Sequence, residues 1–150
     1  MTAPQSNDRF TDATRNCITT AKKLVMEYKH SHITPEHIFL GLLQDQTPLL
    51  LTALSKAKAK PDQMKQLVLH HLKPTDNAVP EEWITFSERA KRVIETAKEE
   101  AQRVRATQIG PEHLLLGLTR VNNTIAGAVL RAVQLDTESV RKAIGQPPAA

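Results

Sequence analysis

Apolar residues recur at helical spacing along most of the chain. In two stretches they follow one another at steps of three or four residues, namely Cys17, Ala21, Leu24, Tyr28 and Ala90, Ile94, Ala97, Ala101, Val104. Residues at these spacings share one face of an α-helix. Thr11 and Ser87 precede the two stretches, and their side chains can accept hydrogen bonds from the free N–H groups at a helix start. The pattern therefore predicts two long amphipathic helices, one in each half.

A shorter helix is expected after each long one. Thr34-Pro35 and Gly110-Pro111 are typical of a cap followed by the first helical position, where the missing N–H of proline costs nothing. Apolar residues follow at positions that form an inner face: Ile38, Phe39, Leu42, Leu43 and Leu114, Leu115, Leu118. Gly41 and Gly117 lie inside these helices, where glycine costs roughly 1 kcal/mol relative to alanine. They indicate close contact between helices.

Two further helices complete each half. We expect one around 48–57 and another after Pro61 in the first half, and one around 125–133 and another after Asp136 in the second. Residues 73–85 contain two prolines and read as a linker between two four-helix units. Residues 1–9 form a polar lead-in, and 146–150, with two prolines, form a tail that cannot continue a helix.

The two halves are copies of one another. Residues 33–42, ITPEHIFLGL, return as residues 109–118, IGPEHLLLGL, at an offset of 76 positions that also relates Phe10 to Phe86 and Leu54 to Leu130. A repeat of this length is a signature of a duplicated fold. Each unit alone is near the size at which a core is marginal. We therefore predict an all-α fold in which repeats of about 10–72 and 86–145 share a core, as one compact eight-helix domain with pseudo-twofold symmetry.

Composition narrows the class of protein. Aromatic residues make up 3% and glycines number five, which favours aliphatic helix packing over a β-sandwich. The net charge of +4 comes from scattered lysines and arginines, so solvated helix faces are favoured over a nucleic-acid surface. The single cysteine, Cys17, allows no internal disulfide. Without a signal-like apolar core or a bilayer-length apolar run, we expect a cytoplasmic protein with no membrane association.

No catalytic or cofactor motif accompanies the repeat. The sequence has no phosphate-binding glycine loop, no Gly-x-Ser-x-Gly and no His-Glu-x-x-His. His30 and His32 have no histidine counterparts in the second copy. His37 and His113 are expected to pack or cap, and His70-His71 to lie exposed at a helix end. We therefore expect no metal, no cofactor and no enzymatic activity.

Glu36 and Glu112 are the candidate functional residues. Each falls in the first turn of a predicted helix, where the N–H groups and the macrodipole favour an ionised carboxylate. Such a carboxylate can simply stabilise the helix start, which is the commoner role. It can also hold a guanidinium or ammonium group through charge-assisted hydrogen bonds. The residues alone favour the first interpretation and leave the second open.

The repeated Pro-Glu-His motif resembles the N-terminal domain of Clp-type AAA+ unfoldases. The openings Arg9-Phe10-Thr11 and Ser87-Glu88-Arg89-Ala90-Lys91 extend the resemblance over residues 9–145. The second copy is more similar to the ClpC branch, and the first to ClpB. The resemblance implies a non-enzymatic domain that recruits substrate or adaptor proteins to a Clp ATPase ring, often coupled to a ClpP-type peptidase.

The resemblance also implies a ligand. In ClpC-type domains the motif glutamate binds the guanidinium of phosphoarginine, while a hydroxyl at the first-helix start and a basic residue hold the phosphate. This implies one pocket from Glu36 with Thr11 and another from Glu112 with Ser87 and Lys91. ClpB-type domains share the motif and bind exposed hydrophobic segments, so both ligand classes stay open.

The sequence departs from the family at two points. The glycine-rich stretch after the motif is replaced by residues 44–47 and 120–123, and no AAA+ module lies within the 150 residues. Two hypotheses follow: an excised recognition domain, or a free-standing accessory protein that docks on a Clp assembly and stabilises or regulates it. In isolation we expect a monomer, because eight packed helices use up the apolar faces.

Overall fold

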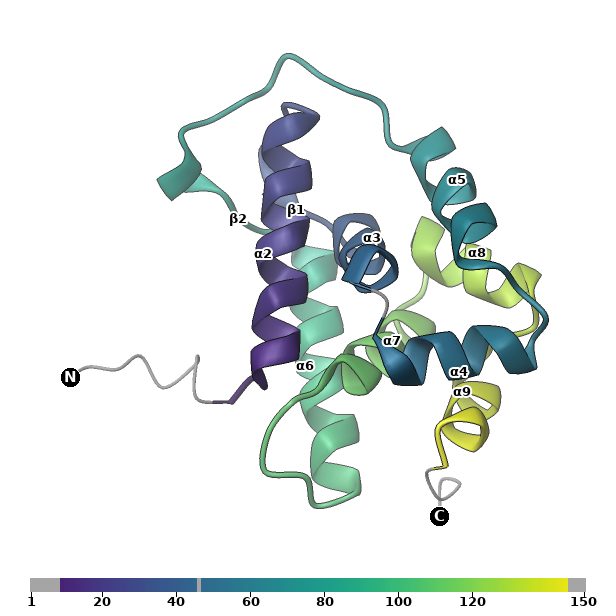
Figure 1. Cartoon of the computed structure of the whole chain (residues 1–150). Coiled ribbons are helices and arrows are strands. Elements are labelled where there is room, and N and C mark those ends of the chain that lie inside the picture. Colours follow the sequence, from purple (N-terminus) through teal and green to yellow (C-terminus); the bar gives the residue numbers. More distant parts are fainter. Residues whose placement is uncertain (1–8, 46, 146–150) are drawn as a thin grey trace.

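The computed structural model describes residues 9–45 and 47–145 (Figure 1). The predicted lead-in, apart from Arg9, and the predicted tail lie outside them. The described residues form eight α-helices, in the order α2 (Asp12–Glu27), α3 (Pro35–Asp45), α4 (Pro48–Lys56), α5 (Pro61–His71), α6 (Glu88–Arg103), α7 (Pro111–Arg120), α8 (Ile125–Ala132) and α9 (Thr137–Ala143). The predicted all-α fold with eight helices is confirmed.

The long helices α2 and α6 start and end at positions 76 apart, as the repeat predicts. Their caps are also as expected. Thr11 Oγ1 accepts a hydrogen bond from the Thr14 N–H at 3.1 Å, and Ser87 Oγ accepts one from the Ala90 N–H at 3.1 Å. Each cap satisfies a donor that the helix itself leaves free.

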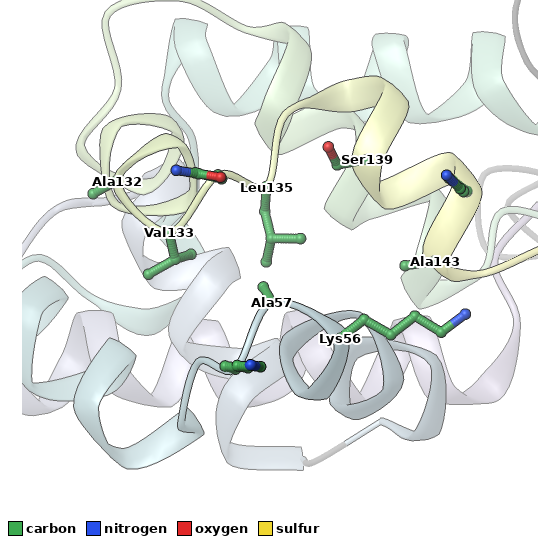
Figure 2. Close-up of a pocket in the computed structure, with 10 residues that line it drawn as sticks. Lys56, Ala57, Ala132, Val133, Leu135, Ser139 and Ala143 are labelled. Atoms are coloured by element: carbon green, nitrogen blue, oxygen red, sulfur yellow. The ribbon is translucent and has the colours of Figure 1, made fainter.

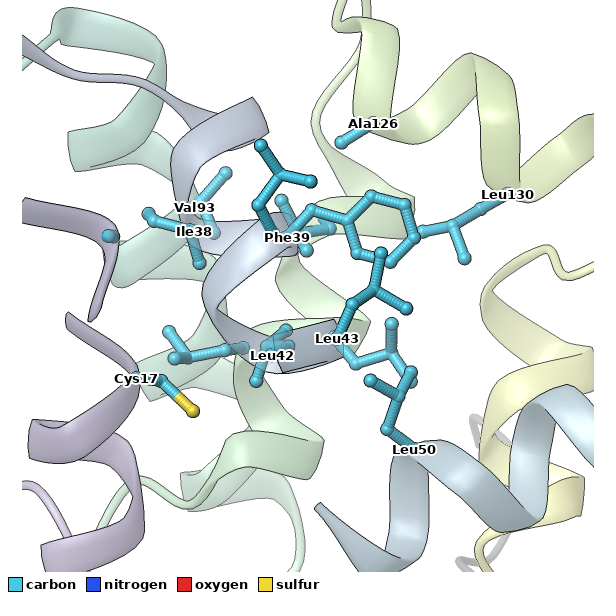
Figure 3. Packing of buried hydrophobic residues seen from close by; sticks show 14 of the residues in the cluster. Cys17, Ile38, Phe39, Leu42, Leu43, Leu50, Val93, Ala126 and Leu130 are labelled. Atoms are coloured by element: carbon cyan, nitrogen blue, oxygen red, sulfur yellow. The ribbon is translucent and has the colours of Figure 1, made fainter. Parts of the chain in front are cut away.

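The two repeats share one core, in which α3 and α7 are central. All residues from His37 to Leu43 are buried, so this part of α3 is enclosed on every side. In Figure 3 the Phe39 ring reaches across to Leu130 of the other repeat. Cys17 is fully buried beneath α3, and burial together with the nearby Asp45 carboxylate raises the pKa of its thiol to about 12. It is a structural thiol, as the sequence predicts.

Short strands cross-connect the repeats, which the sequence did not predict. Strand β1 (His32–Ile33) pairs in parallel with β2 (Thr85–Phe86), and Phe10 forms the equivalent bridge with Ile109. The residues that lead into each long helix therefore pair with the residues that precede the short helix of the other repeat. Two-residue strands are too short to leave a periodic pattern.

The segment between the repeats is fastened to the end of α2. The Thr75 N–H donates to the Tyr28 carbonyl at 3.0 Å. Further on, residues 73–85 contain a short 3₁₀ helix, η1 (Glu81–Trp83), and the first residue of β2. The predicted linker thus carries structure of its own.

Alanine at Gly117 is expected to lower the free energy of unfolding by about 1–3 kcal/mol, through overpacking. A Cβ there would lie 2.6 Å from the Val93 carbonyl oxygen, and one at Gly41 would lie 2.5 Å from that of Cys17. Both contacts are with backbone of the neighbouring long helix, which cannot move aside as a flexible side chain could. Urea denaturation of Gly117→Ala measures the loss. Ser55→Ala, on the exposed face of α4, serves as control. Equal or greater stability of Gly117→Ala would contradict this tight helix crossing.

Candidate functional site

A depression of about 510 Å³ surrounds Glu36 at the start of α3. Its walls come from the turn after α2, the end of α5, the segment after it and the start of α6. Because β1 pairs with β2, Ser87 of the second repeat lies beside the start of the first repeat's short helix. Its N–H donates to the Ile33 carbonyl at 2.9 Å. The pocket is therefore built from both repeats.

The Glu36 carboxylate is held in place by a helix of the other repeat. Its Oε2 accepts a hydrogen bond from the Ala126 N–H, at the start of α8, at 3.0 Å. Glu36 lies in the first turn of α3, as predicted, but the N–H group from which it accepts belongs to the start of α8 and not to its own helix. In the described part of the chain Oε1 of Glu36 accepts no hydrogen bond. One oxygen thus orients the carboxylate while the other can accept from a ligand.

His37 and His113 close the first turns of α3 and α7. The Thr34 N–H donates to His37 Nδ1 at 2.9 Å, and the Gly110 N–H donates to His113 Nδ1 at 2.8 Å. These bonds confirm the capping role expected for both histidines. They also fix the tautomer, because a nitrogen that accepts a hydrogen bond cannot carry the proton.

A second histidine extends this arrangement in the first repeat. His37 Nε2 carries the proton and lies 2.9 Å from His30 Nδ1, and His30 Nε2 lies 2.7 Å from the Lys73 carbonyl oxygen. Since a carbonyl only accepts, His30 donates from Nε2 and accepts at Nδ1. The relay holds Lys73 at the pocket wall, and both rings are neutral in it. Burial, and then the neighbouring His30, lower the pKa of His37 to about 4.

Sequence reasoning missed His30 and Lys73 as parts of this site. The missing information is tertiary, because Lys73 reaches the pocket only through the fold of the segment after α5. His71, expected to be exposed at a helix end, is exposed and also lines the pocket.

The sequence-based prediction paired Glu36 with Thr11, and Glu112 with Ser87 and Lys91, each within one repeat. The structure contradicts this pairing. Glu36 shares its pocket with Ser87, and Thr11 is not among the residues that line it. Thr11 instead donates its N–H to the Ile109 carbonyl at 3.1 Å, three residues before Glu112. The repeats exchange their lead-in segments, so each long helix starts beside the segment that leads into the short helix of the other copy.

Glu112 and Lys91 are less constrained than Glu36. The Glu112 side chain is 26% exposed and folds back over Gly110, with His113 Nε2 at 4.0 Å. Burial lowers the pKa of His113 below its ordinary value, against the opposing effect of the Glu112 and Glu100 charges. Lys91, one turn after Ser87 on α6, is exposed and lies 3.2 Å from Glu88 Oε2.

Residues 9–45 and 47–145, which the structure describes, show neither a metal site nor a membrane-spanning helix. These residues contain no cluster of three or more His, Cys, Asp or Glu side chains that could hold a metal ion. Their helices are also all too short or too polar to span a bilayer.

The family model for the Clp repeat (R) N-terminal domain matches residues 9–133 and, in a second match, residues 85–147. The ATP-binding subunit ClpC of a Clp protease from Staphylococcus aureus is 28% identical over 143 residues, which cover 93% of this chain and 17% of that protein. The chain therefore spans about 17% of the length of this relative.

Solved structures show the same fold. The N-terminal domain of ClpD from Arabidopsis thaliana superposes with a TM-score of 0.69 at 24% identity, covering 91% of this chain and 95% of that one. The ClpV N-domain in complex with a VipB peptide gives 0.75 at 15% identity, covering 99% and 96%. With a family model matched over most of its length, this chain belongs to the Clp repeat N-terminal domain family.

Proposed function

We propose that this chain is a non-enzymatic recognition domain of a Clp chaperone or protease system, which binds substrate or adaptor proteins. The observation that carries the proposal is the Glu36 pocket. It combines an oriented carboxylate, a helix-start hydroxyl and a lysine in one depression between the repeats. The VipB peptide bound to the ClpV N-domain supports peptide recognition by this fold.

The chemistry of the pocket suits phosphoarginine, whose guanidinium and phosphate need opposite partners. The free oxygen of Glu36 can accept from the guanidinium through a charge-assisted hydrogen bond. Ser87 Oγ already accepts from the Ala90 N–H, so its own O–H can donate to a phosphate oxygen. The N–H groups at the start of α6 favour an anion at the same place, and Lys73 lines the pocket as a cation.

The five candidate residues fall into two sites under this proposal. Glu36 and Ser87 form the first, with Lys91 one turn further along α6. Glu112 and Thr11 form the second. The sites are related by the same pseudo-twofold symmetry that exchanges the lead-in segments.

Glu36→Gln is expected to weaken phosphoarginine binding at the first site about tenfold or more, because it removes the charge from a charge-assisted hydrogen bond. Glutamine keeps an oxygen that can accept from the Ala126 N–H, so the fold is preserved. Calorimetry with phosphoarginine, and with arginine and phosphate separately, measures the effect. Glu95→Gln, an exposed position on α6, changes the net charge equally and serves as control.

Amide NMR separates the two sites. Ser87→Ala is expected to reduce ligand-induced shifts around Glu36 and leave those around Glu112 intact, since the hydroxyl acts across repeats. If phosphoarginine binds neither site, the glutamates only stabilise helix starts. A double Glu36→Gln, Glu112→Gln variant that still co-purifies with an intact Clp ring or peptidase would then favour the accessory function.

A further inference from the structure

A second depression, of about 620 Å³, lies where the two repeats meet at the ends of α4, α8 and α9. These helices lie together at the right of Figure 1, away from the β1–β2 pair. Equivalent residues of the repeats face each other in it. Ala57 and Val133 are 76 positions apart, as are Lys58 and Gln134. The depression therefore lies between the matching ends of α4 and α8, with α9 along one side. None of the described residues that line it also lines the Glu36 pocket.

Its walls are two matching helix ends with fixed backbones. Lys58 and Gln134 both adopt the left-handed conformation, with φ of 57° and 64°. The next residue of each turn donates its N–H back into the helix, from Ala59 to Leu54 and from Leu135 to Leu130, at 2.8 Å in both cases. Such bonds satisfy carbonyls that a helix end leaves free. The site is preformed.

The floor of the depression is apolar. Figure 2 shows Leu135 projecting into its centre above Ala57, with Val133 beside them and Ala143 of α9 on the opposite wall. Leu135 is only 3% exposed, so it forms the base and does not project into solvent. An aliphatic side chain entering from outside would exclude water from these groups, which favours its binding.

The rim is cationic. Lys56, Lys58 and Lys142 come from three segments, and no Asp or Glu is among the described lining residues. Nor does any of the three form an ion pair within the described part of the chain. Three helix C-termini converge here and contribute roughly half a negative charge each. The lysines outweigh them, so the rim attracts anions.

We propose that this depression binds an acidic segment of a partner protein, which packs an aliphatic side chain onto the floor formed by Ala57, Val133 and Leu135. A small inorganic anion would make no use of the apolar floor. A nucleic acid would lack a stacking partner, since no aromatic residue is among the described lining residues. Several carboxylates flanking one apolar anchor match both the spread of the three lysines and the floor.

Fluorescence anisotropy with a labelled peptide of Asp and Glu residues around two leucines tests the proposal. We expect the triple variant Lys56→Gln, Lys58→Gln, Lys142→Gln to weaken binding about tenfold or more, as three rim charges acting together allow. The matched control is Lys23→Gln, Lys65→Gln, Lys98→Gln, which changes the net charge equally on α2, α5 and α6. We expect this control to bind like the unaltered chain.

Three other results would overturn the proposal. Equal losses in both triple variants would mean non-specific attraction by net charge. Undiminished binding of a peptide with serine in place of both leucines would mean that the apolar floor is not used. No peptide binding at a peptide concentration of about 1 mM would mean that the site does not bind an acidic segment. The same conclusion would hold if anionic lipid vesicles bound and the peptide did not. Loss of the Glu36 site leaves all these measurements unaffected.

Discussion

Replacing Glu100 with alanine is expected to lower the free energy of unfolding by about 3–5 kcal/mol, the range for breaking a buried ion pair on one side. Glu100 is 1% exposed on α6 and accepts hydrogen bonds from Arg141 Nη2 at 2.6 Å and Arg120 Nη1 at 2.9 Å. Arg141, on α9, is itself buried. Without Glu100 its charge would stay in a poorly solvated place, with the exposed Glu138 as its remaining carboxylate partner in the described residues. Chemical denaturation measures the loss.

The adjacent residue provides a matched control. Glu99 Oε1 is bonded to the same Arg120, at 3.0 Å, but the Glu99 side chain is 61% exposed. Glu99→Ala should therefore change stability by less than about 1 kcal/mol. A double variant, Glu100→Leu with Arg141→Met, should recover much of the loss because no buried charge remains unpaired. Similar stability of Glu100→Ala and Glu99→Ala would refute the role of the buried network.

This carboxylate is ionised in the folded state. Burial alone would raise the pKa of Glu100, but the hydrogen bonds and charge of Arg141, followed by the charges of Arg120 and Arg103, lower it below its ordinary value. The same bonds raise the pKa of Arg141. The network thus fastens the short helix α9 to α6.

The Glu100 network also shows where sequence reasoning reaches its limit. The pattern predicted an inner face of α6 that includes Ile94 and Val104, whereas the structure leaves both partly exposed and buries Val93 and Glu100. A charged residue reads as solvent-facing in a periodicity argument. The repeat did contain a signal that position 100 is buried, because the equivalent position 76 residues earlier is the buried Leu24.

The helices were predictable for a simple physical reason. Their periodicity, caps and prolines are local, and the offset of 76 made each repeat a check on the other. The assembly of the candidate site was not local. It depends on β1 and β2, two residues each, which exchange segments between repeats. Ser87 was identified correctly as the cap of a helix start. Glu36 was expected to stabilise its own helix and instead bonds the start of α8, and the two residues were assigned to different pockets.

Stability is expected to fall as the pH is lowered from 6.5 towards 4, by up to about 3 kcal/mol from His37 alone. His37 is fully buried, and its pKa is about 4 in the fold against an ordinary value of 6.5. Between these values the unfolded chain binds a proton that the folded chain does not, so protonation favours unfolding. Above pH 6.5 both states are neutral at this ring and the contribution is constant. His113, whose pKa is also lowered, acts in the same direction.

One substitution separates the contribution of His37 to the pH dependence from that of the other titrating groups. In His37→Gln, Thr34 and the glutamine form the standard capping box, so the reciprocal cap at the start of α3 is kept without a titrating group. Urea denaturation at pH 7, 6 and 5 stays above the ordinary pKa of a glutamate, about 4.3. Only near that pKa would the unfolded chain bind a proton that Glu100, with its lowered pKa in the fold, does not bind. We expect the variant to lose clearly less stability over this range than the unaltered chain, and His70→Gln, at an exposed position, to behave like the unaltered chain. Parallel losses in His37→Gln and the unaltered chain would show that the buried relay does not set the acid sensitivity of this fold.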